Sequence, residues 1–161
     1  MKRVILIVGL TLLTNTAYAD PQSEISAYRK LYGLSAVTVD AKLTELARKQ
    51  ATAMAERRSL DHNVYAPFRS RMSSYGMSSA GENIAMGTRT FSDTLAVWKS
   101  SSGHNANLLL RNATRIGLAS ASSHGTTYWA LILAAPSEPK HRTIEVLSVF
   151  PFVILMRTGA P

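Results

Sequence analysis

A run of almost uninterrupted apolar and aromatic residues, TTYWALILAA at 126–135, constrains the fold of this chain more than any other feature. A strand with one face in water alternates apolar and polar residues, whereas this run predicts a central strand covered on both faces. The preceding run, RIGLASA at 115–121, predicts a neighbouring strand. The SSHG segment between them predicts a hairpin loop in which Gly125 takes a positive φ. Helices should therefore lie on both sides of a small sheet.

Several other segments have the periodicity of helices. The clearest is 41–58, where apolar residues recur at helical spacing behind Asp40, a residue type that caps the first turn. Thr90 and Asp93 resemble a capping box before a helix at 91–100. Shorter helices are expected at 23–32, after Pro67 and at 104–110, and a short strand is expected at Ile84–Met86.

The N-terminal residues follow the three-part pattern of a secretory leader. Lys2 and Arg3 precede an apolar core, Val4–Leu13, and Ala17-Tyr18-Ala19 forms a small-x-small cleavage site. The core is shorter than the roughly 20 apolar residues of a bilayer span. We therefore predict cleavage after Ala19, a single domain at 20–139 with no transmembrane span, and a location in the periplasm or outside the cell.

Composition limits how an exported domain of this sequence can be stabilised. The chain has no cysteine, so it must fold without disulfides, and its 46% hydrophobic content is sufficient for a core. The net charge of +8 favours contact with acidic surfaces. The basic residues are dispersed rather than clustered, however, which predicts a solvated surface and no nucleic-acid partner. Basic residues that lie close in sequence occur as separate pairs along the chain: Arg48/Lys49, Arg57/Arg58, Arg69/Arg71 and Lys140/Arg142.

The C-terminal segment 140–161 contains the apolar run VLSVFPFVILM at 146–156. Pro151 interrupts the run, which is too short to cross a bilayer. Two interpretations remain open: the run docks on the domain as an edge element, or it contacts a membrane surface. The second is disfavoured because an amphipathic pattern is missing.

The four histidines differ in their sequence context. His124 in SSHG and His141 in KHR have the surroundings of surface residues. His62 in SLDH and His104 in WKSSSGHNANLL lie at element boundaries, and AGENIA, with Glu82, lies between them. A buried carboxylate such as Glu82 needs a cationic or hydrogen-bonding partner, and the two imidazoles are candidates.

These motifs occur in a characteristic order: AYRKLYGL, LDH, AGENIA, WxxSxGHxxNLL, RIGLA and YWALIL. In this order they resemble the CAP superfamily of cysteine-rich secretory, antigen 5 and pathogenesis-related proteins, and in particular its short cysteine-free bacterial branch. The resemblance extends from about Ile25 to Ala135. It implies an α+β fold, a three-layer α-β-α sandwich with a small, mainly antiparallel sheet, and a cleft lined by two histidines and acidic residues.

On this resemblance His62, His104 and Glu82 converge in the cleft. Neutral imidazoles of His62 and His104 could ligate zinc, with Glu82 accepting the proton on the other ring nitrogen, ligating the metal or orienting a water. Protonated imidazoles would instead form a pH-sensitive polar network with Glu82. The sequence leaves both readings open. Asn83 and Asn107 are interpreted as amides that cap backbone groups near the cleft.

One position departs from the pattern of eukaryotic relatives, which often carry a second acid three residues after the helix tryptophan. Here that position is Ser101, so the cleft has three of the four groups plus a hydroxyl. Fewer negative ligands should weaken metal binding and acid–base catalysis. A serine hydrolase is disfavoured as well, because no Gly-x-Ser-x-Gly elbow is present.

Three functions remain. The sequence favours a secreted binding module for a lipid-like, peptide or envelope ligand, with or without a bound divalent metal. The alternatives are a metal-assisted hydrolase, with Glu82 as general base, and a non-catalytic structural or interaction protein.

Overall fold

The computed structural model of the chain describes residues 20–136. The predicted leader at 1–19, its cleavage site, the C-terminal segment 140–161 and His141 lie outside the described residues, so the predictions made for them stay predictions. Within residues 20–136 no helix is long and apolar enough to cross a bilayer.

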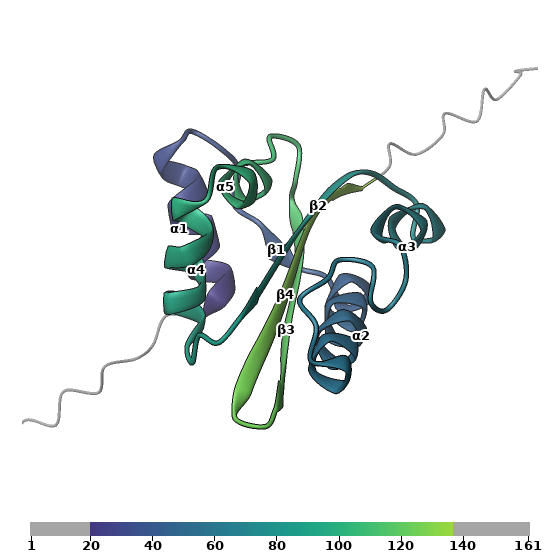
Figure 1. Ribbon diagram of the computed structural model, residues 1–161. Coiled ribbons are helices and arrows are strands. Elements are labelled where there is room, and N and C mark those ends of the chain that lie inside the picture. The colour runs from purple at the N-terminus through teal and green to yellow at the C-terminus, as the bar shows by residue number, and fades with distance from the viewer. Residues whose placement is uncertain (1–19, 137–161) are drawn as a thin grey trace, which may run out of the picture.

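A four-stranded sheet forms the middle of the described fold, with the strand order β1-β3-β4-β2. Strand β1 runs parallel to β3, and the two other pairings are antiparallel. The predicted central strand is β4, which pairs with β3 on one side and with β2 on the other (Figure 1). The strands are β1 (Thr38–Val39), β2 (Met77–Met86), β3 (Arg115–Ser123) and β4 (Thr126–Pro136).

Helices cover both faces of the sheet, and this confirms the predicted three-layer α+β fold (Figure 1). Alternate residues of β4 enter two separate cores. Ala130 and Ile132 pack in one core with α2, whereas Leu131 and Leu133 pack in the other. One face carries α2 (Ala41–Arg57) and α3 (Phe68–Ser74), and the other carries α1 (Pro21–Leu31), α4 (Phe91–Ser100) and α5 (Ser102–Leu108).

The predicted caps are confirmed where they were expected. The Asp40 carboxylate accepts hydrogen bonds from the backbone N–H groups of Lys42 and Leu43, and the Thr90 hydroxyl accepts one from the N–H of Asp93. The first helix begins earlier than the apolar pattern predicted, because Asp20 caps it before Pro21.

Helix α2 lies directly against the sheet because β3 carries a glycine at the contact. A Cβ atom at Gly117 would lie 2.1 Å from the carbonyl carbon of Leu43. No side chain fits in that space, so Gly117 sets the close approach of α2 to β3.

Two strand predictions were wrong in extent. Strand β2 covers Met77–Met86 rather than Ile84–Met86, because its polar and small residues pair with β4 over nearly their whole length. The hairpin between β3 and β4 is also tighter than a four-residue SSHG loop. Its turn consists of His124 and Gly125, with φ of 47° and 77°, as a two-residue hairpin turn requires.

Candidate functional site

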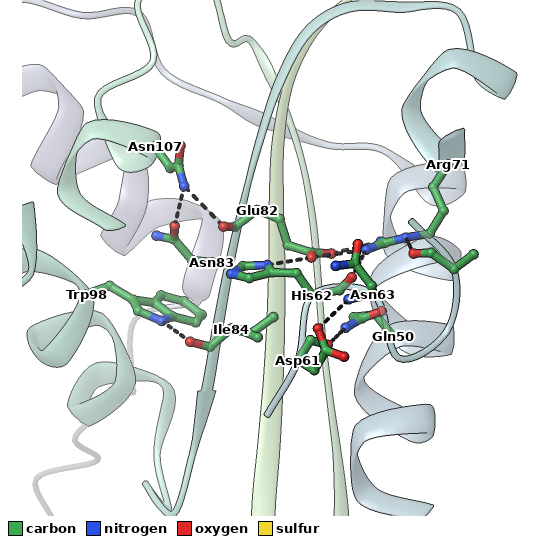
Figure 2. A network of polar contacts seen from close by, with 11 residues as sticks. Gln50, Asp61, His62, Asn63, Arg71, Glu82, Asn83, Ile84, Trp98 and Asn107 are labelled. Atoms are coloured by element: carbon green, nitrogen blue, oxygen red, sulfur yellow. Dashed lines mark hydrogen bonds and ion pairs between the residues drawn. The ribbon is translucent and has the colours of Figure 1, made fainter. Parts of the chain in front are cut away.

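Glu82 lies on β2 with only 1% of its side chain exposed, and its main partner is Arg71 of α3. Arg71 Nη1 donates to Glu82 Oε2 at 2.8 Å and Nη2 donates to Oε1 at 3.0 Å. Figure 2 shows this two-pronged contact between the helix and the strand. A buried carboxylate is stable in this position because the guanidinium offsets its charge and matches its geometry.

The prediction that Arg71 belongs to the solvated surface was wrong. Its side chain is 3% exposed, and it also donates hydrogen bonds to the backbone carbonyls of Ala66 and His62. Arg71 therefore holds the loop before α3 as well as Glu82. The helical spacing could have indicated that Arg71 is buried, since Arg71 lies on the same side of α3 as Phe68 and Met72.

His62 is the second partner of Glu82, at 2.9 Å between Nδ1 and Oε1. A carboxylate held by Arg71 only accepts hydrogen bonds, so Nδ1 of His62 must be the protonated donor. In the neutral imidazole, Nε2 then carries the free lone pair. Because 47% of the His62 side chain is exposed, the ring is anchored on its buried side and accessible elsewhere. We call His62, Arg71 and Glu82 the Glu82 cluster.

The loop that carries His62 is anchored by α2. Gln50 is fully buried and its Nε2 donates to the backbone carbonyl of Asp61 at 2.6 Å, one residue before His62. The Asp61 carboxylate in turn accepts the backbone N–H of Asn63 at 2.9 Å. These bonds fix the backbone on both sides of His62, as Figure 2 shows.

His104 on α5 is close enough to His62 for the charge of one imidazole to affect the other. Burial, and after it the charge of His62, lowers the pKa of His104 below its ordinary value. Its Nδ1 is buried without a hydrogen-bond partner within the described part of the chain. Among the described residues, His62 thus has a direct hydrogen bond to Glu82, whereas no hydrogen bond joins His104 to His62 or to Glu82.

Two asparagines connect α5 to the buried part of β2, as the sequence predicted for backbone-capping amides. Asn83 donates to the carbonyl of His104 at 2.9 Å, and Asn107 donates to the carbonyl of Glu82 at 3.1 Å. Trp98 of α4 donates to the carbonyl of Ile84 at 3.2 Å. Side chains thereby cover carbonyls along the outer edge of β2, which would otherwise be open to pairing (Figure 2).

Ser101, the fourth predicted residue of the cleft, lies at the boundary between α4 and α5. It is the N-cap position of α5, but its side chain makes no capping hydrogen bond. No hydrogen bond among the described residues joins its hydroxyl to Glu82 or to either imidazole, so no base is in place to activate it as a nucleophile.

The two imidazoles meet part of what a zinc site requires. The neutral His62 ring fits a ligand, since its Nε2 is free and its Nδ1–H is held by a carboxylate. A zinc site needs three or four protein ligands, however, and residues 20–136 contain no group of three histidine, cysteine, aspartate or glutamate side chains that could hold a metal. His62 and His104 alone do not make a dedicated zinc site.

The sequence profile of the CAP family, described as the cysteine-rich secretory protein family, matches residues 22–133. This chain belongs to the CAP family. The YkwD protein of Bacillus subtilis (strain 168) is 34% identical over 120 residues, which cover 65% of this chain. The same alignment covers 46% of YkwD, so the chain spans less than half the length of that relative.

Solved structures confirm the CAP fold. An outer surface protein of Borrelia burgdorferi is 21% identical, with a TM-score of 0.65 over 72% of this chain and 90% of that one. An extracellular SCP-domain protein of Bacillus anthracis is 21% identical, with a TM-score of 0.61 over 71% of this chain and 39% of that one. The bacterial relatives of this CAP domain thus include extracellular and surface proteins.

Proposed function

We propose that this CAP domain is an exported binding module, and that His62 is the side chain that contacts its ligand. Nε2 of His62 would accept a hydrogen bond from the ligand when the ring is neutral and would donate one when it is protonated. His104 is proposed as the second polar contact. The ligand class that we propose is a component of the cell envelope, either lipid-like, peptidic or glycan.

The observation that carries the proposal is the anchoring of His62. A half-exposed imidazole whose Nδ1 is bound to a buried carboxylate loses little conformational freedom on binding. Arg71 fixes that carboxylate from the other side. Ligand-binding groups are commonly prepared in this way, with the contact residue held by partners that the ligand never touches.

The same geometry disfavours a metal-assisted hydrolase with Glu82 as general base. A base must reach a water or a substrate proton within hydrogen-bond distance. Oε1 of Glu82 already accepts from His62 and Arg71, Oε2 accepts from Arg71, and the side chain is 1% exposed. Glu82 therefore supports the proposal as an orienting group rather than as a reacting one.

We also propose that the imidazoles of His62 and His104 bind zinc weakly. Because the described residues provide two candidate ligands, we expect His62 and His104 to bind zinc weakly and below one ion per chain at micromolar zinc. Isothermal titration of the metal-stripped protein would measure this. Stoichiometric tight binding would require a third ligand and would reopen the hydrolase interpretation.

An export route to the periplasm or the cell exterior supports an envelope ligand. The predicted leader at 1–19 and the extracellular and surface relatives both agree with it. The leader carries Lys2 and Arg3, so the exported chain keeps 16 basic and 10 acidic residues, and a net charge of about +6 would assist contact with anionic envelope polymers.

The proposal is tested by binding measurements on two matched variants, His62→Asn and His124→Asn. NMR titrations would use three probes: a muropeptide, a short-chain phospholipid and an unstructured peptide. We expect at least one probe to shift resonances around His62, and we expect His62→Asn to weaken that binding at least tenfold. His124 lies in the hairpin turn, where asparagine tolerates the positive φ, so its variant should bind like the parent.

Two outcomes would overturn this function. If none of the probes binds, the module has no ligand of the proposed class. If His62→Asn lowers the melting temperature and leaves the affinity unchanged, the Glu82 cluster is a structural device that ties the loop and α3 to the sheet.

A further inference from the structure

A groove of about 520 Å³ lies between α3 and the first half of β2, apart from the Glu82 cluster. Its apolar lining comes from Phe68 and Met72 on the helix and from Met77 and Ala80 on the strand. Arg69, Ser73 and Ser79 supply the polar part of the lining. We call this the α3–β2 groove. Its size is that of a site for a few apolar side chains or a small ligand.

The chain leaves the described fold beside this groove. Strand β4 ends at Pro136, and in the antiparallel pairing Pro136 lies opposite Met77, which lines the groove. Figure 1 shows the end of β4 next to the start of β2 and near α3. Whatever follows Pro136 therefore starts at the rim of the α3–β2 groove.

The sequence that follows Pro136 contains an apolar run. Residues 146–156, VLSVFPFVILM, include two phenylalanines and are too short to span a bilayer. An exposed apolar segment of this kind is a liability for association in an exported protein. The run therefore needs an apolar surface on which to bury its side chains.

We propose that residues 146–156 of this chain dock in the α3–β2 groove of the same molecule. The connection at 137–145 reaches at most about 30 Å when extended, so the run can return to a groove that begins beside Pro136. Such a short tether gives an effective concentration on the order of millimolar, which makes weak apolar contacts sufficient. Pro151 has no backbone N–H, so side chains in the groove rather than a continuous strand carry the contact.

Charge agrees with this placement. Glu145 immediately precedes the apolar run, and Arg69 lies on the exposed rim of the groove. The two opposite charges would attract each other when the run lies in the groove. The proposal concerns a surface separate from His62 and does not depend on the proposed binding function.

The absence of cysteine from the whole chain makes disulfide trapping a clean test. The chain from Asp20 to Pro161 would carry Ser73→Cys in the groove and Ser148→Cys in the run. A control pair would combine Ser148→Cys with Ser122→Cys, because Ser122 is exposed near the hairpin at the opposite end of the sheet. A disulfide forms only when the two Cα atoms approach within about 7 Å.

We expect the groove pair to form an intramolecular disulfide at least tenfold faster than the control pair under mild oxidation at low protein concentration. Adding Phe152→Asp to the groove pair should reduce its rate to that of the control. The substitution lies outside residues 20–136, so the circular dichroism spectrum should be unchanged. Equal rates for the two pairs, disulfides only between molecules, or no effect of Phe152→Asp would each overturn the proposal.

Discussion

Removing one partner of the Arg71–Glu82 pair should destabilise the domain far more than removing both. Arg71→Met leaves a carboxylate that is 1% exposed, with His62 as its one remaining side-chain partner within residues 20–136, and it also frees the carbonyls of Ala66 and His62. Breaking a buried ion pair in this way costs about 3–5 kcal/mol of unfolding free energy. Glu82→Met should cost a similar amount, because it leaves a buried guanidinium whose acceptors in the described part of the chain are the backbone carbonyls of Ala66 and His62.

The double variant Arg71→Met/Glu82→Met removes both charges and keeps apolar volume in their place. Buried ion pairs replaced by apolar residues are often close to neutral in stability. The free energy of unfolding that the double variant loses should therefore be smaller than the sum of the two single losses by at least about 2 kcal/mol. A coupling energy of this size is usual for residues in contact.

Urea unfolding followed by tryptophan fluorescence would give the four free energies of this cycle. Arg71→Lys keeps the charge but loses the two-pronged geometry, so it provides a folded intermediate case should a methionine variant fail to fold. Exposed ion pairs usually show single losses below about 1 kcal/mol that add without coupling. Such a result here would refute the argument that Arg71 and Glu82 are buried and depend on each other.

Three further predictions concern other parts of the fold. Gly117→Ala should destabilise the domain by about 3 kcal/mol in urea unfolding, because the new methyl group would overlap the backbone of α2. Gly103→Ala is the control: nothing lies within 4 Å of its added Cβ, so the free energy of unfolding should change by less than about 1 kcal/mol. Folding lowers the pKa of His104, so the neutral ring contributes to the free energy of unfolding. This contribution is fully present above about pH 6.5 and is lost as the pH falls through the lowered pKa. When the pH is lowered from about 7.5 to 5.5, the melting temperature of His104→Asn should therefore fall less than that of the parent or of His124→Asn. An equal fall of the melting temperature in all three proteins would contradict this. Arg29→Met should cost about 3 kcal/mol or more in thermal unfolding, because the fully buried guanidinium donates to four backbone carbonyls, and a loss below about 1 kcal/mol would mean that those carbonyls find other donors.

The layers of the fold could be predicted because the signals for them are local and repeated. The apolar run at 126–135 required cover on both faces, and β4 indeed sends alternate residues into two cores. Asp40 and Thr90 marked helix starts through capping chemistry that depends on residues only a few positions away.

The site was harder to predict because its decisive contact joins distant elements of the structure. The order of the motifs predicted His62 as a partner of Glu82, and the hydrogen bond between them is present. Arg71 was not predicted, because an arginine in a polar stretch usually lies in solvent, and its guanidinium reaches Glu82 only because α3 packs against β2. The length of β2 escaped prediction for a related reason, since its polar residues are buried only through partners from α3 and α5.

The measurement that tests the central claim most directly is the tautomer of neutral His62, read from two-bond nitrogen–proton NMR spectra of the imidazole. If Glu82 holds Nδ1–H and leaves Nε2 for a ligand, neutral His62 should be the Nδ1-protonated form, and Glu82→Gln should change that population while the His124 signals stay the same. A neutral His62 that carries its proton on Nε2, with or without Glu82, would contradict the account.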